Sequence, residues 1–130
     1  MAANEKTIQI FTKEEREKLG KKYLKEIKKA LSGLDAEILK LNLHLMDECA
    51  HYAVALKEMN LMIERDGFME RYQNGENQWG TKKTVAAELK PKYTQMYQGL
   101  IKQLISLLPT ESEKNAATEL LEFLNNDKLA

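Results

Sequence analysis

The stretch DAEILKLNLHLMDECAHYAVALKEMNLMIERDG, residues 35 to 67, decides the fold. It contains no proline, and its only glycine is its last residue, so it predicts one unbroken helix from Asp35 to Asp66 with Gly67 as a left-handed stop. At about 1.5 Å per residue this helix is roughly 48 Å long. On a helical wheel its apolar residues form two stripes, which together cover more than half of the circumference. The first stripe contains Ile38, Leu41, Leu45, Cys49, Tyr52, Leu56, Met59 and Ile63, and the second contains Leu39, Leu43, Met46, Ala50, Ala53 and Leu61.

Two apolar stripes are more than a single neighbouring helix can bury. We therefore expect the helix to pack inside its own subunit on one side and against another copy of the chain on the other, because a monomer would leave a large apolar patch in water. The alternative is that the remaining helices of the same subunit cover both stripes.

The same helix carries half of a di-metal motif, because Glu48 stands three positions before His51. A carboxylate-bridged di-metal site needs two such units and two further glutamates, all pointing into a bundle. Here there is one unit, and the wheel places it on the polar face. We therefore expect no resident metal or cofactor, although His44, Glu48 and His51 line up well enough for an adventitious surface zinc. The polar face contains Glu37, Lys40, His44, Asp47, Glu48, His51, Glu58, Arg65 and Asp66.

The segments around the long helix predict a mainly α fold with a short β-hairpin insertion. After a flexible tail over residues 1–11, a capping box of Thr12 and Glu15 opens a helix that reaches Leu31. Asn74-Gly75 predicts a two-residue turn within a hairpin at 68–80, with a structureless loop as the alternative.

Two further helices are expected after the hairpin. Thr84 opens the first, Pro91 must kink or restart it, and it ends at Leu108. A second capping box, Thr110 with Glu113, opens a last helix. Residues 12–109 are thus the expected helical core and oligomerisation domain, and 110–130 a separate C-terminal helix.

Charge is distributed in blocks along the chain, although the net charge is zero. Segments 1–30, 31–70, 71–109 and 110–130 carry +4, −5, +4 and −3. Such alternation suits a protein that meets neighbours through complementary patches, with chance variation of the surface as the alternative.

The first helix concentrates its positive charge on one side. Opposite its apolar stripe, within about 120° of arc, lie Lys18, Lys21, Lys22, Lys25, Lys28 and Lys29. Such a face can neutralise phosphates, and lysine suits the DNA backbone better than base edges. The alternative is a solvated face with basic residues near the helix C-terminus. Lys82 and Lys83, beside Trp79, are a second candidate contact with DNA.

Other features exclude several classes of protein. The chain has one cysteine, Cys49, which the wheel places in the core, so no internal disulfide forms and a cytoplasmic setting is expected. The N-terminus has no apolar signal core, and no stretch is long enough to span a membrane. No phosphate loop, nucleophile elbow or zinc-spaced cysteine pair is present, so we expect no enzymatic activity.

The order of parts in 35–110 resembles the small terminase subunit of tailed bacteriophages, in the branch found with cos-type packaging. The residues that carry the resemblance are LHLMDECAHYAVALKEMNLMIERDGF, NGENQWGTKK and LKPKYTQMYQGLIKQLISLLPTE, with Glu64 to Gly67, Asn74-Gly75 and Leu104 to Pro109 as the matching features. They cover over half of the chain and include no catalytic signature. Several members carry an N-terminal helix-turn-helix domain. Residues 1–34 contain only one expected helix, so they do not form a domain of that kind.

The resemblance implies a helical, ring-forming homo-oligomer in the host bacterial cytoplasm. The resemblance also implies that this oligomer binds double-stranded viral DNA at the packaging start site and delivers it to the large terminase subunit. It would modulate the ATPase and nuclease of that subunit. We expect the ring contacts to involve Leu41, Leu45, Tyr52, Leu56, Leu100 and Leu104. The expected docking residues for the large subunit are Glu111, Glu113, Glu119 and Glu122.

Three other functions compete with this one. The first is a dimeric helical adaptor or regulator that does not bind DNA. The second is a small di-metal oxidoreductase, which the position of Glu48 and His51 argues against. The third is an antitoxin or repressor, which needs a groove-reading motif that the sequence lacks.

Overall fold

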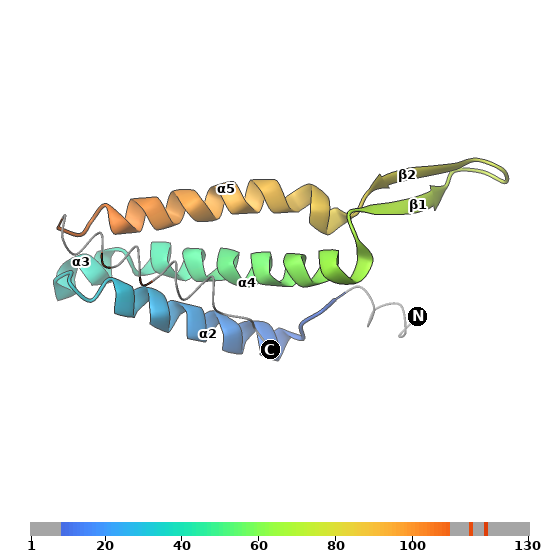
Figure 1. Cartoon of the computed structure of the whole chain (residues 1–130). Helices are drawn as coiled ribbons and strands as arrows, with labels where there is room; N and C mark the ends of the chain where they lie inside the picture. Colours follow the sequence, from blue (N-terminus) through green and yellow to red (C-terminus); the bar gives the residue numbers. More distant parts are fainter. Residues whose placement is uncertain (1–8, 110–114, 116–118, 120–130) are drawn as a thin grey trace.

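The computed structural model describes residues 9–109, 115 and 119 and shows a mainly helical fold with one two-stranded sheet. The elements are α2 (Lys13–Ala30), α3 (Ala36–Leu41), α4 (Leu43–Asp66), β1 (Met69–Gln73), β2 (Trp79–Lys83) and α5 (Val85–Ile105). Helix α4 contacts both α2 and α5 and lies between them, while the hairpin β1–β2 projects beyond the helices (Figure 1). This confirms the predicted helical class with a hairpin inserted between two helices.

Side chains cap the starts of α2 and α3, and the cap at Thr12 is as predicted. Thr12 Oγ1 accepts a hydrogen bond from the Glu15 N–H at 3.1 Å, and Glu15 Oε1 accepts one from the Thr12 N–H at 3.2 Å, so the capping box is complete. Asp35 caps α3 by accepting a hydrogen bond from the Ile38 N–H at 2.9 Å. These bonds satisfy N–H groups that a helix start leaves without an intrahelical partner.

The prediction of one helix from Asp35 to Asp66 is wrong at Asn42. This residue ends α3 and precedes α4 with φ −109° and ψ 13°, outside helical geometry. Its side-chain Nδ2 donates to the Ile38 carbonyl at 2.9 Å, in the way that asparagine competes with the helical backbone. The central helix is therefore the 24-residue α4, about 36 Å long instead of 48 Å.

The end of α4 and the start of α5 are tied together at the base of the hairpin. Gly67 ends α4 with the predicted positive φ of 81°, but its ψ of −173° is extended and not left-handed helical. The Thr84 hydroxyl donates to the Gly67 carbonyl at 3.0 Å and accepts from the Ala87 N–H at 3.4 Å. The Thr84 N–H donates to the Phe68 carbonyl at 2.9 Å. One buried residue thus caps α5, as predicted, and closes the hairpin.

The connection within the hairpin is longer than predicted. The two strands are antiparallel, and their last pair is Gln73 with Trp79, which leaves five residues between the strands instead of two. The Asn74 N–H donates to the Gln78 carbonyl at 2.8 Å across this loop. Gly75 has a φ of 126°, so Asn74-Gly75 lies in the turn as expected but does not form it alone.

Helix α5 runs unbroken through Pro91, so of the two predicted effects of this proline, a kink or a restart, the restart does not occur. The helix ends at Ile105, earlier than the predicted Leu108. The N–H groups of Leu107 and Leu108 donate to carbonyls three residues back, at 3.2 and 3.0 Å, in the tighter geometry common at helix ends.

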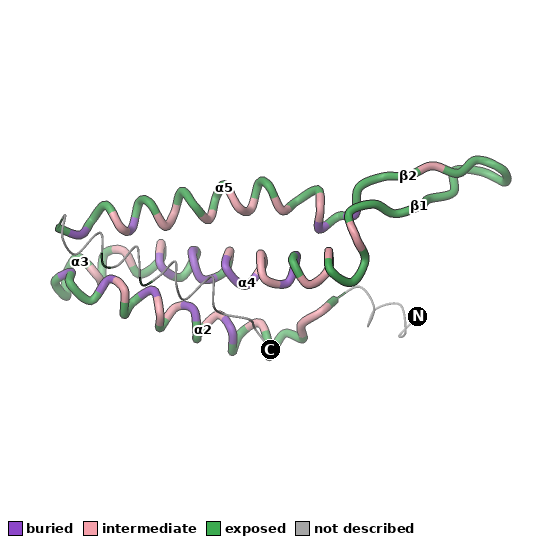
Figure 2. The backbone as a smooth tube through the Cα atoms, viewed as in Figure 1, coloured by how far each residue is buried: buried purple, intermediate pink, exposed green. Residues whose placement is uncertain are grey.

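The core lies where α2 and α5 meet α4 (Figure 2). It takes Cys49 and Met59 from the first predicted stripe of α4 and Met46, Ala50 and Ala53 from the second. Helices of the same subunit therefore bury part of both stripes, while Leu45, Tyr52 and Leu56 of the first stripe stay partly exposed. That a second copy covers the rest stays a prediction. The buried apolar residues are Leu19, Tyr23, Ile27, Leu31, Leu34, Met46, Cys49, Ala50, Ala53, Val54, Met59, Ala86, Leu104 and Leu108.

Large apolar residues remain exposed at both ends of the helical body. At the α3–α4 junction these are Ile38, Leu41 and Leu43, and Leu41 is 74% exposed. Next to the hairpin they include Phe68 and Val85, which are 70% and 66% exposed.

The predicted C-terminal helix lies outside the described residues, as do Glu111, Glu113 and Glu122, whereas Glu119 is described and exposed. Among the helices that the structure describes, none has the length and apolar character needed to cross a lipid bilayer.

Candidate nucleic-acid interface

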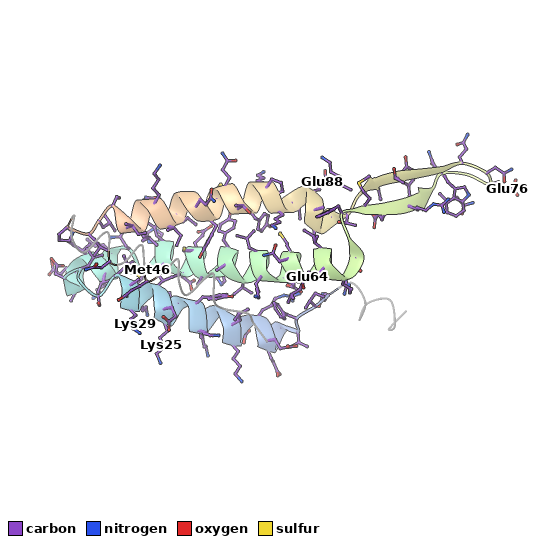
Figure 3. All side chains as sticks on the ribbon, viewed as in Figure 1. Lys25, Lys29, Met46, Glu64, Glu76 and Glu88 are labelled. Atoms are coloured by element: carbon purple, nitrogen blue, oxygen red, sulfur yellow. The ribbon has the colours of Figure 1, made fainter. Side chains whose placement is uncertain are left out.

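Helix α2 turns its apolar stripe inward and its lysines outward. Leu19, Tyr23 and Ile27 are buried against α4. Figure 3 shows Lys25 and Lys29 pointing away from the helices. Exposure is shared by all six lysines predicted on this face, which are Lys18, Lys21, Lys22, Lys25, Lys28 and Lys29. We call these six residues the lysine face.

Positive charge predominates on the lysine face, although exposed Glu14 and Glu17 lie beside its N-terminal end. Between Lys18 and Lys29 the only acidic residue is Glu26, which is half-buried and falls outside the lysine arc on the helical wheel. Lys28 and Lys29 also occupy the last turn of α2, where the helix dipole favours positive charge. A polyanion is therefore the ligand that this surface attracts most strongly.

The hairpin separates the second pair of predicted DNA-binding lysines. Neighbouring residues of a strand point to opposite faces, so Lys82 and Lys83 do not share a surface. The Lys82 Nζ lies 3.5 Å from Glu70 Oε1 and 5.7 Å from the centroid of the Tyr72 ring. Arg71, which we did not predict as a site residue, lies on the same face as Lys83. Strand register brings these two together, and the sequence does not show that register.

The predicted ring-contact residues differ in accessibility. Leu41 is 74% exposed and available to a second copy, whereas Leu104 is 1% exposed and belongs to the subunit core. Tyr52 packs edge-on against Tyr93, with ring centroids 5.3 Å apart. The partly buried members of the set are Leu45, Tyr52, Leu56 and Leu100.

At the half-motif of a di-metal site, the structure and the helical wheel agree that the side chains lie on the polar face of α4. His44, Glu48 and His51 are all exposed, so Glu48 and His51 do not point into the bundle. Within the part of the chain that the structure describes, no group of three or more histidine, cysteine or acidic residues is placed to hold a metal ion.

Glu58 is the exception on that face, because the predicted solvated residue is 6% exposed. Arg16 Nε and Nη2 donate to its two carboxylate oxygens, each at 2.9 Å. The N–H groups of Ile10 and Phe11 donate to Glu58 Oε2 at 3.1 and 3.0 Å, so the prediction of a flexible tail is wrong for these two residues. The first eight residues of that predicted tail lie outside the described residues. The wheel placed Glu58 by angle alone and missed its partner on α2.

Burial and hydrogen bonding act on the pKa of Glu58 in opposite directions. Burial by itself raises that pKa, while the Arg16 side chain and the N–H groups of Phe11 and Ile10 lower it. The hydrogen bonds prevail, and the pKa lies below its usual value of 4.5. The carboxylate is therefore charged at neutral pH and fixes the start of the chain to α4.

Two buried polar groups lie together in the core. Cys49 is a buried packing residue, as predicted, and burial raises the pKa of its thiol to about 12. The Tyr97 hydroxyl has no hydrogen-bond partner among the described residues. Burial, followed by the proximity of Cys49 and Tyr23, raises the pKa of Tyr97. Neither group is poised to ionise, so we assign them no chemistry.

A groove of about 830 Å³ lies between the second half of α4 and the first half of α5, at the base of the hairpin. Its lining is mixed, with apolar Met59, Met62 and Leu89 beside charged Arg65 and Asp66. Asp66 is already paired with Arg65 at 2.7 Å.

No family model matches this chain, and comparisons with curated proteins and with solved structures found no match either.

Proposed function

We propose that this protein is a DNA-binding subunit that assembles into a multi-copy ring and acts as a small terminase subunit. It binds double-stranded viral DNA in the bacterial host and delivers it to the large terminase subunit, whose ATPase and nuclease it regulates. It carries out no chemistry of its own. Acidic residues in 110–130, with Glu119 among them, form the dock for the large subunit.

The lysine face of α2 is the observation that supports this proposal most. Its six lysines are exposed along one helix, opposite the buried stripe, so binding at this face needs no rearrangement of the core. Lysines that contact phosphates release counterions, and this gives affinity without base recognition. Copies of one such face around an assembly would form a continuous basic belt.

The exposed apolar residues support the assembly. The patch at Leu41 and Leu43 and the patch at Phe68 and Val85 lie at opposite ends of α4 and are different surfaces. A contact between two different surfaces of the same chain is head-to-tail, and such contacts give rings when the rotation closes. The resemblance of the sequence to small terminase subunits points to the same arrangement.

The salt dependence of DNA binding tests the role of the lysine face. Replacing Lys21, Lys22, Lys25, Lys28 and Lys29 together with glutamine should weaken binding to a labelled duplex. It should also flatten the plot of log K against log salt by about 0.9 for each phosphate that the variant no longer neutralises. Fluorescence anisotropy between low and moderate salt measures both quantities. An unchanged slope would remove α2 from the DNA surface.

A matched pair of variants separates local contact from net charge. The double variant K25Q/K29Q removes two charges from the lysine face, and K92Q/K102Q removes two from exposed positions on α5. The first variant should reduce the steepness of the plot of log K against log salt by about 2, and the second should leave it unchanged. Equal effects would mean that only overall charge matters.

A dimeric helical adaptor that does not bind DNA is the second candidate. It is favoured by one observation, namely that α2 and α5 bury part of α4 and leave less apolar surface for contacts between copies than the sequence suggested. Such an adaptor has a mass of two chains and shows no salt-dependent affinity for duplex DNA.

A further inference from the structure

The register of the hairpin sorts its side chains onto two faces. Residues paired across an antiparallel sheet point to the same side, and neighbours along a strand point to opposite sides. The pairs Met69 with Lys83, Arg71 with Thr81 and Gln73 with Trp79 therefore form one face, and the pairs Glu70 with Lys82 and Tyr72 with Gly80 form the other. We call the first the cationic face and the second the neutral face.

The charged and aromatic side chains of the neutral face contact one another. Lys82 pairs with Glu70 at 3.5 Å and lies over the Tyr72 ring. Tyr72 in turn covers Gly80, because a Cβ at that glycine would lie 2.8 Å from Tyr72 Cζ. On this face Glu70 therefore balances the positive charge of Lys82, and the Tyr72 ring already packs against Lys82 and Gly80.

The cationic face has two positive charges and no acidic residue. Arg71 Cζ lies 5.1 Å from the centroid of the Trp79 ring, in a cation–π contact that holds the guanidinium beside the indole. Trp79 nevertheless stays 58% exposed. Lys83 lies at the other end of the same face, near the helices.

The hairpin presents this face away from the helical body. Every residue of β1 and β2 is exposed except Gly80, which is half-buried, and Figure 1 shows the strands extending past the ends of α4 and α5. The base is fixed by the hydrogen bonds of Thr84 to Gly67 and Phe68. A two-stranded ribbon fits the major groove of B-DNA, which is about 12 Å wide. An isolated ribbon is only marginally stable in water, so contact with a partner would also stabilise it.

We propose that the cationic face is a second contact surface for duplex DNA, separate from the lysine face, with Arg71 and Lys83 binding phosphates and Trp79 packing beside them. This rests on the proposed function. A polyanion is the partner because the two cations have no acidic neighbour on this face, and Gln73 and Thr81 add polar groups that suit a phosphate backbone. Lys82 is not part of the site.

Adjacent lysines on opposite faces provide the test. K83Q and K82Q each remove one charge from neighbouring positions of β2, and the second serves as the matched control. With a random-sequence duplex, K83Q should lower the slope of log K against log salt by about 0.9, R71Q/K83Q should lower it by about 2, and K82Q should leave it unchanged. Equal slopes for K83Q and K82Q would overturn the proposal.

Trp79 adds a measurement that needs no variant, because it is the only tryptophan in the chain. Saturating the wild-type protein with duplex DNA should shift or quench its fluorescence. Unchanged emission at saturation, with anisotropy still showing bound DNA, would overturn the hairpin site and leave the lysine face intact. Emission that follows protein concentration but not DNA would make this face a contact between copies and also overturn the proposal. A wild-type protein that binds no duplex would overturn both the hairpin site and the proposed function.

Discussion

Glu58 joins the start of the chain to the central helix. Its carboxylate accepts hydrogen bonds from Arg16, Ile10 and Phe11, which lie far from it in sequence. A buried carboxylate is stable only when it is paired and hydrogen-bonded, and these partners meet that need. This one residue therefore couples the entry to α2 with the packing of α2 on α4.

The variant Glu58→Gln should lower the free energy of unfolding by about 1–2 kcal/mol. Glutamine keeps the size of the side chain but loses charge-assisted hydrogen bonds, and the effect is moderated because the Arg16 side chain is 36% exposed. Urea unfolding measures the change. Glu48→Gln, at an exposed position on the same helix, is the control and should change stability by less than about 0.5 kcal/mol. Equal effects of the two variants would contradict the role of Glu58.

The same residue predicts a pH dependence. The pKa of Glu58 in the folded protein lies below 4.5, so its stabilising contribution is present above that pH and is lost as the pH falls through the lowered value. Since glutamine does not titrate, the stability difference between wild type and Glu58→Gln should narrow in acid. A difference that stays constant from neutral pH to strong acid would contradict this.

Individual residues show which side-chain positions the sequence predicted correctly and which it did not. The wheel correctly placed Cys49 inside and Glu48 and His51 outside, because those positions depend only on helical angle. It misplaced Glu58, because Arg16 reaches it from another helix. The sequence also grouped Lys82 with Lys83, which only the strand register could separate.

Among the elements, the boundaries set by local chemistry were predictable. The caps at Thr12 and Thr84 form as expected, since each needs only a side chain and an N–H two or three residues on. The break at Asn42 and the five-residue hairpin loop were not predicted. Both depend on hydrogen bonds that compete with the regular pattern, and a scan for proline and glycine does not detect them.

Gly67 and Gly99 should respond oppositely to alanine, although a Cβ added at either glycine would meet no atom within 4 Å. Gly67 has a φ of 81° with extended ψ, which is nearly exclusive to glycine, so Gly67→Ala should destabilise by about 1–3 kcal/mol. Gly99 lies inside α5, so Gly99→Ala should stabilise by about 0.5–1 kcal/mol. Thermal unfolding of both variants checks the two signs. A stabilising Gly67→Ala would contradict the role of the positive φ.

For the whole molecule, the case for assembly rests on different residues than the sequence suggested. Helices α2 and α5 bury Met46, Cys49, Ala50 and Ala53 in the middle of α4, so these residues are not available to a second copy. Exposed apolar residues at the two ends of α4, such as Leu41 and Phe68, are the surfaces that we propose for contacts between copies. A helical wheel shows how much of a helix is apolar, but it does not show which neighbours of the same chain cover it.

The native mass of the purified protein tests the central claim of a multi-copy, DNA-binding assembly most directly. Each chain contributes 15.0 kDa, and we expect a single discrete species of many chains that remains assembled when duplex DNA binds. The variant Leu41→Glu, which places a charge at the exposed α3–α4 junction, should reduce that mass without changing helical content. A mass of 15.0 kDa for the wild type, with and without DNA, would contradict the claim.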